Sequence, residues 1–339
     1  MYRWLVLLYF LASFFLKADE NTSVLNADFF AGALADATAI SEESGKQRLI
    51  DVKSTTLSPA LAFGSSFKYI NNPEKNSVFS RKRDGSALDV SLTLSMGLGE
   101  YGLSDFAVCA PSLMLMKMRT YNDPNKDFGR EMEAYDVDVQ IAGLSLPFVL
   151  PYDFVATLGH TYVVPSQFRN NDNILSYSNT PNFSIARPFN LPFLGTIALT
   201  TGISYTFSEG DTLEESLSSV GLPASVVNAI ATPDAIASSP YNLQNGLSHT
   251  IGISCPININ EKLSLTPSLN YSKMYYDKGS NDGRRDTTYS GGASASYKLT
   301  DWANFSCSAT YTQKETNGNL SPEFKDFVGG ITIGFSHAF

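Results

Sequence analysis

The 339-residue sequence is short of charge. Asp, Glu, Lys and Arg make up 17% of it, against roughly 25% in a typical soluble domain. The net charge is -9, which argues against a nucleic-acid-binding protein, because such proteins need basic surfaces for phosphate. Glu and Lys are sparse where Gly, Ser, Thr, Asn and Tyr are abundant. This mixture favours strands and turns over long helices.

Cysteine and histidine are scarce as well. The three cysteines (Cys109, Cys255 and Cys307) show no metal-ligand spacing, and each lies in a predicted strand, so we expect them to act as small apolar side chains. The three histidines fall on apolar strand faces, with no sign of a base beside a nucleophile. The sequence therefore predicts no enzyme activity, no metal and no cofactor.

No apolar run after residue 18 resembles a membrane helix, which needs about 20 residues. At the N-terminus, Arg3 precedes a 13-residue apolar run over 4–16. Residues 1–18 are therefore predicted to be a secretory signal peptide, with an uncleaved anchor as the alternative. An exported chain with so little charge and no membrane helix is either a secreted β protein or a membrane β-barrel.

Residues 19–57 form an acidic leader, in which Phe29, Ala33, Leu34, Ala37 and Ile40 follow helical spacing. Three interpretations stay open for this leader. It is a periplasmic extension, a plug inside a barrel, or a mostly disordered segment.

From residue 58 onward, apolar residues recur with a period of two, as in strands with one apolar face. Within 86–98, for example, Leu88 and Val90 alternate with Asp89 and Ser91. Most such stretches run 12 to 15 residues, whereas a tilted membrane strand needs about 9–11. Twelve strands are predicted: 58–70, 86–98, 105–118, 133–146, 151–164, 181–190, 195–207, 246–259, 262–276, 287–299, 302–313 and 328–339.

The connections between these strands alternate in length. The short ones are 99–105, 147–150, 191–195, 259–261 and 300–301. The long ones are 71–85, 119–131, 165–180, 208–245, 277–286 and 314–327. This alternation is typical of outer-membrane barrels. We therefore predict an all-β fold, a twelve-stranded antiparallel transmembrane β-barrel over 58–339, with short periplasmic turns and long extracellular loops.

Two features complicate the strand pattern. Pro111 and Pro267 lie within predicted strands, where each either removes a ladder hydrogen bond or marks a bulge. The stretch around Gly143 predicts a change of face.

Few charges fall on the face predicted to line the lumen. Asp89, Asp136 and Asp138 together predict a pore biased toward cations. The complete set of predicted lumen charges is Lys68, Asp89, Asp136, Asp138, Asp153 and Lys298.

The loop at 208–245 is the leading candidate for a pore constriction. It is too long and too apolar for us to expect it to lie free in water. Thr212 and Glu215 form a capping-box pattern, so two short helices that narrow the pore are one hypothesis. A lid packed on neighbouring loops is the other. The constriction candidates are Leu213, Glu214, Glu215, Leu217, Val226, Val227 and Ile230.

Two stretches resemble parts of known families. Residues 297–311, "YKLTDWANFSCSATY", resemble a penultimate hairpin of Gram-negative outer-membrane barrels. The alternation that ends at Phe335, His337 and Phe339 resembles the C-terminal signal that such barrels present to the barrel-assembly machinery. His337 departs from that signal, which usually has Tyr or an apolar residue there.

The size and leader resemble the transporters of the MetA-pathway-of-phenol-degradation family, and channels of the FadL type are a looser match. These resemblances imply a porin-like outer-membrane channel for passive uptake of small solutes. More specifically, they imply hydrophobic or aromatic solutes. The expected partners are outer-membrane lipid and lipopolysaccharide, the barrel-assembly machinery and a small-molecule solute. The alternative is a structural or adhesive barrel whose extracellular loops bind a partner, without transport.

Deletion of 212–236 distinguishes the two hypotheses for the long loop. If the loop narrows the pore, the deletion raises single-channel conductance and changes solute preference. Conductance and preference equal to those of the intact protein would contradict the constriction and leave the lid.

Overall fold

The computed structural model describes residues 57–71, 84–104, 107–123, 136–168, 173–174, 176–191, 195–210, 244–318 and 323–339. The predicted signal peptide (1–18) and all of the leader except Leu57 lie outside these residues. So do all the predicted constriction residues of the long loop, from Leu213 to Ile230.

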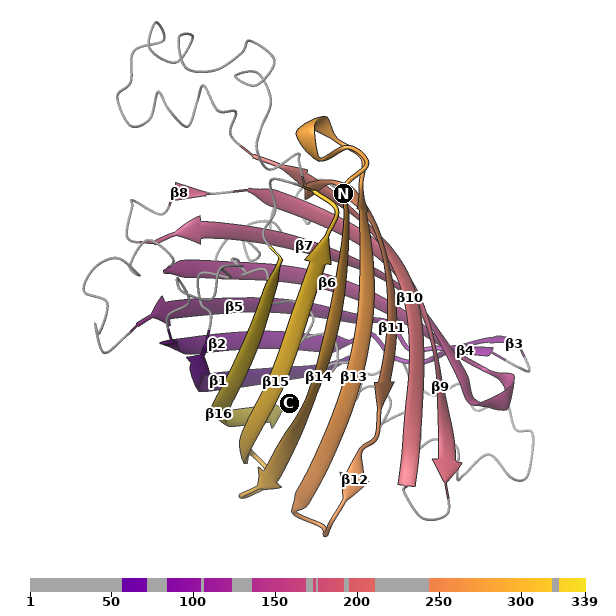
Figure 1. Cartoon of the computed structure of the whole chain (residues 1–339). Helices are drawn as coiled ribbons and strands as arrows, with labels where there is room; N and C mark the ends of the chain where they lie inside the picture. Colours follow the sequence, from indigo (N-terminus) through magenta and orange to yellow (C-terminus); the bar gives the residue numbers. More distant parts are fainter. Residues whose placement is uncertain are drawn as a thin grey trace, which may run out of the picture.

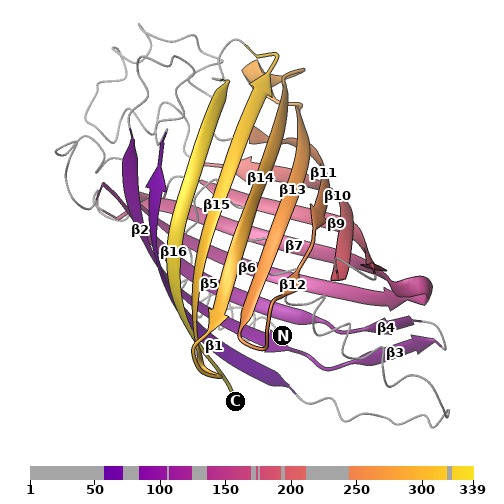
Figure 2. The same cartoon turned by 60° about the horizontal axis from the view of Figure 1, so that its bottom comes forward.

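Twelve long strands form one closed antiparallel barrel, as predicted (Figure 1). Sequential strands pair with each other, and β1 pairs with β16 from Ala60↔Ala338 to Ile70↔Val328, which closes the wall (Figure 2). The strands are β1 (Ser58–Ile70), β2 (Gly85–Gly97), β5 (Ser112–Asn122), β6 (Val137–Leu150), β7 (Phe154–Gln167), β9 (Tyr177–Leu191), β10 (Gly195–Glu209), β11 (Gly246–Ser254), β13 (Leu263–Tyr276), β14 (Arg285–Lys298), β15 (Ala303–Thr316) and β16 (Phe324–Ala338).

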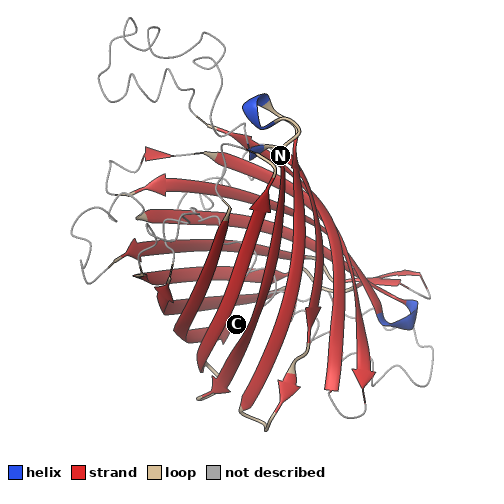
Figure 3. Cartoon of the chain, viewed as in Figure 1, coloured by secondary structure: helices blue, strands red, loops and turns tan. Residues whose placement is uncertain are grey.

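Short segments complete the described part of the chain (Figure 3). None of its helices is long and apolar enough to span a membrane. The short segments are β3 (Tyr101–Ser104), β4 (Ala107–Cys109), β8 (Asn173–Ile174), β12 (Ile257–Asn258) and the single 3₁₀ turns η3 (Pro151–Asp153) and η5 (Gly279–Asn281).

The predicted turn at 99–105 is wrong. The chain continues there as β3 and β4, which pair at Tyr101↔Cys109 and extend the β2–β5 hairpin beyond the barrel wall. The Leu98 N–H donates to the Pro111 carbonyl at 2.8 Å, so hydrogen bonding continues from the wall into this extension. As a result the third barrel strand is β5, later in the sequence than the predicted 105–118.

The predicted interruptions at proline are confirmed. Pro111 lies between β4 and β5, where no strand is assigned. Pro267 lies in β13 opposite the gap between β11 and β12, and its carbonyl accepts the Cys255 N–H at 3.0 Å. Each proline lacks an N–H, so one ladder hydrogen bond is missing at each site.

The strand register determines which face each side chain occupies, because directly opposed residues on neighbouring strands point to the same side of a sheet. Alternate residues around the barrel form an outward apolar face. Leu269, Ile203 and Ile331 expose 63%, 50% and 50% of their surface on it. Water-soluble proteins bury such side chains, whereas a barrel in hydrocarbon turns them toward lipid.

Aromatic side chains gather at both ends of this outward face. At the short-turn end, the Phe335 ring stacks with Trp302 and Phe63 at centroid distances of 5.9 and 6.3 Å. At the long-loop end, the Tyr271 and Tyr289 rings lie 5.5 Å apart. Rings at both boundaries of an apolar belt are typical of the headgroup regions of a bilayer.

Candidate functional site: the barrel lumen

The inward face of β9–β16 consists almost entirely of small or polar side chains. Ser178 and Ser208 share a hydrogen bond of 3.0 Å across β9 and β10, and Thr332 donates to Ser66 at 3.0 Å across β16 and β1. Such hydroxyl groups form hydrogen bonds with one another along the wall. This arc is the polar part of the lumen.

Lys68 on β1 and Asp89 on β2 lie on the inward face of the wall. The Lys68 ammonium contacts the Asp89 carboxylate at 2.5 Å, and the Thr120 hydroxyl donates to the other Asp89 oxygen at 2.8 Å. Asp89 is 6% exposed. A carboxylate this buried requires such partners, because burial without them costs several kcal/mol. The pair is therefore close to electrically neutral.

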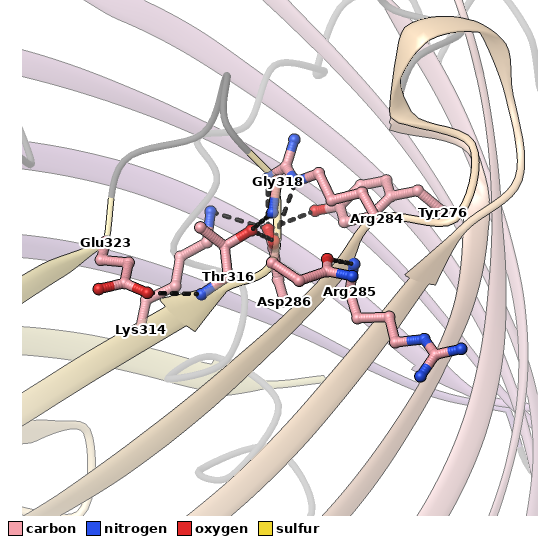
Figure 4. Close-up of polar contacts among 9 residues, drawn as sticks. Tyr276, Arg284, Arg285, Asp286, Lys314, Thr316, Gly318 and Glu323 are labelled. Atoms are coloured by element: carbon pink, nitrogen blue, oxygen red, sulfur yellow. Dashed lines mark hydrogen bonds and ion pairs between the residues drawn. The ribbon is translucent and has the colours of Figure 1, made fainter.

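The densest polar cluster of the inward face centres on Asp286, near the long-loop end of β14 (Figure 4). Lys314 and Arg284 form ion pairs with this carboxylate. The Tyr276 and Thr316 hydroxyls donate to it at 3.0 and 2.6 Å. Asp286 is not among the predicted lumen charges, because the predicted strand begins at residue 287. A start two residues earlier would have placed Asp286 on the same face as Thr288 and Ser290.

The other predicted lumen charges lie at strand ends. Lys298 is the last residue of β14 and its ammonium pairs with Asp301 at 2.7 Å. This hydrogen bond lowers the pKa of Asp301. Asp153 is exposed in the turn η3, so its predicted place on the wall is wrong. Asp136 directly precedes β6 and accepts the Asn122 N–H at 2.6 Å.

The predicted lumen position of Asp138 is wrong. Asp138 pairs in register with Arg119, and Arg119 pairs with Val90 on the outward face. Arg119 donates to both Asp138 oxygens, at 2.6 and 2.9 Å, and the Lys117 ammonium lies 3.4 Å away. An outward carboxylate is tolerated here because two cations neutralise it. The alternation along a single strand cannot reveal partners on a neighbouring strand.

An apolar patch interrupts the polar inward face of the barrel on β5–β7. Met116, Val139 and Ile141 are buried there, and Met114 and Val163 pack against them. The register stays continuous through the Gly143 region, so the predicted change of face is wrong. Each strand keeps the same side toward the lumen along its length. Around Gly143 the polarity of the inward and outward faces is exchanged instead.

The three histidines lie on different strands. His160 pairs with Leu144 on the outward face, and His249 is on the same face opposite Ile203. His337 pairs with Leu61 and contacts the Phe339 ring edge-on at 4.8 Å. Phe335, the first residue of the predicted assembly signal, belongs to the aromatic group at the short-turn end.

These features define the class of the protein: the closed ladder, the outward apolar face and the aromatic rings at both ends are those of an outer-membrane β-barrel. No family model and no curated protein matches the chain. The resemblance to the MetA-pathway family therefore stays a prediction.

Solved structures with similar architecture include three barrels. The β domain of the Bordetella autotransporter BrkA is 11% identical, with a TM-score of 0.44, over 82% of this chain and 99% of that one. An outer-membrane channel from Pseudomonas putida F1 is 11% identical, with a TM-score of 0.43, over 86% and 100%. The KdgM porin is 7% identical, with a TM-score of 0.38, over 81% and 98%. The closed ladder of the chain itself, rather than these likenesses, identifies the barrel.

Replacement of Asp138 tests its outward ion pairs. We expect Asp138→Ala to lower the free energy of unfolding by about 1–3 kcal/mol, because Arg119 and Lys117 lose a common acceptor. Urea titration of the purified barrel, followed by its heat-modifiable gel shift, measures the change. Asp301→Ala removes an exposed pair and serves as the control, with little expected effect. Equal effects of the two substitutions would contradict the account of Asp138.

Proposed function

We propose that the barrel is a passive channel for small solutes in the outer membrane. The observation that supports this most directly is the polar inward face of β9–β16. A barrel whose interior served only as a packed core would turn apolar side chains inward all around, as the patch of Met116, Val139 and Ile141 does locally. Ser, Thr and Asn side chains along the larger arc of the wall suit water and hydrated solutes instead.

The number of strands supports a narrow pore. Barrels of about 8 strands fill their interior with side chains, whereas those of 16–18 enclose an open aqueous channel. Twelve strands with small inward residues fall between these limits. We therefore expect the barrel to pass small solutes only.

The inward apolar cluster of Met116, Val139 and Ile141 supports a finer proposal about the solute. Met114 and Met118 are only partly buried at the border of the apolar cluster, and the flexible thioether of methionine adapts to varied apolar shapes. A lumen with one polar and one apolar side suits solutes that have both, such as aromatic compounds with a polar group. Hydrophobic or aromatic solutes are thus the preferred class.

Replacement of Lys68 tests the channel and the lumen wall together. Lys68→Met leaves the inward Asp89 without its cation, so we expect the permeability ratio of cations to anions to rise by about fourfold. Loss of one unit charge at about 10 Å in water lowers the energy of a cation by about 0.4 kcal/mol and raises that of an anion equally, a difference of about 0.8 kcal/mol. Reversal potentials in planar bilayers under a salt gradient measure the ratio.

Lys273→Met is the matched control, because it removes the same charge from the outward face and should leave selectivity unchanged. An equal shift in both variants would contradict the lumen position of Lys68. A correctly folded wild-type barrel that passes no current at any voltage would contradict the channel and favour the structural or adhesive alternative.

A further inference from the structure

A groove of about 620 Å³ opens near the long-loop end of β13–β16. Three of the side chains that line it are cations on outward positions of three different strands: Lys273 on β13, Arg285 on β14 and Lys325 on β16. Glu315 lies among them on β15 and accepts a hydrogen bond from Gln313 at 2.9 Å. Glu323 and the inward Lys314 also line the groove, so its cations outnumber its carboxylates by four to two.

The register places these cations at the aromatic long-loop end of the apolar face. Lys273 follows the outward Tyr271 by two residues toward the long-loop end. Lys325 precedes the outward Phe327 by two residues on β16, which runs in the opposite direction. Tyr and Phe rings mark the headgroup boundary of a bilayer. The cations thus lie at the level expected for the phosphates of the outer leaflet.

The ring of Tyr275 holds two of the cations together. The Lys273 ammonium lies 5.4 Å and the Arg285 guanidinium 5.8 Å from its centroid. Both distances are within the range of a cation–π contact. Figure 4 shows the Arg285 side chain directed away from the Asp286 cluster. Tyr275 therefore positions two positive charges side by side on the outward face.

Inward and outward cations differ in their partners within the described part of the chain. The inward-facing Lys314 and its neighbour Arg284 both form ion pairs with Asp286. By contrast, no described carboxylate lies within ion-pair distance of Lys273 or Arg285. The two inward cations thus share a carboxylate inside the protein, whereas the two outward charges face the surroundings of the barrel.

We propose that this groove binds the phosphate-bearing headgroup of an outer-leaflet lipid, which in an outer membrane is the lipid A part of lipopolysaccharide. Arg and Lys form charge-assisted hydrogen bonds to phosphate oxygens. Toward the short-turn end of the same strands, the exposed apolar side chains of Leu269 and Ile331 provide a surface for acyl chains. This continuity of cations with the apolar face favours a lipid over free phosphate.

Binding of matched lipids to the purified full-length protein in detergent tests the proposal. Native mass spectrometry gives the dissociation constants for lipid A and for lipid A stripped of its phosphates, which has the same acyl chains. We expect lipid A to bind more tightly. Each basic residue near a charged membrane surface contributes about 1 kcal/mol, which corresponds to about fivefold in affinity.

The double variant Lys273→Gln, Arg285→Gln should weaken lipid A binding by about 25-fold and leave binding of the stripped lipid unchanged. Arg187→Gln is the control. Arg187 contacts the Phe154 and Phe189 rings near the short-turn end, far along the strands from the groove. This control should bind lipid A as the wild type does. An unchanged heat-modifiable gel shift shows that each variant is folded.

Three results would overturn the proposal. Equal affinity for the two lipids would show that the phosphates are not recognised. Wild-type affinity in the double variant would place the site elsewhere. Displacement of lipid A by millimolar inorganic phosphate would identify a site for free anions instead of a lipid site.

Discussion

The rest of the structure depends on the need to hydrogen-bond every backbone N–H and C=O group in an environment without water. The β1–β16 pairing meets this need, because it joins the first and last strands and leaves no open edge in the wall. Backbone hydrogen bonding is also maintained where the strands are irregular. The extension beyond β2 and the gap after β11 continue the hydrogen bonding through Leu98 and Cys255.

Closure also separates two environments, and the placement of charge follows from that separation. Inward carboxylates such as Asp89 and Asp286 are held by cations and hydroxyl groups of the same wall. Outward charge occurs in two forms. Asp138 is neutralised by Arg119 and Lys117, whereas Lys273 and Arg285 are turned toward the level of lipid headgroups. The same wall thus provides a polar lumen and a surface adapted to a membrane.

Local pattern was enough to predict the architecture. The period of two identified all twelve barrel strands, and β1 has the predicted bounds, because the alternation of apolar and small residues is a property of each strand alone. The errors arose where a position depends on a neighbouring strand. Asp138 is outward because of its register with Arg119, 19 residues away. Asp286 was missed because a strand end is decided by its partners, here Tyr276 and Thr316.

The central claim is that alternate residues of one strand face lipid and a water-filled lumen. Spin labels on β14, in a variant without the three native cysteines, test this most directly. Power-saturation spectroscopy in lipid bilayers compares collisions with oxygen, which concentrates in lipid, and with a water-soluble nickel chelate. Labels at Ala293 and Ala295 should favour oxygen, and labels at Ser294 and Ser296 should favour the chelate. Equal preference at all four positions would contradict the account.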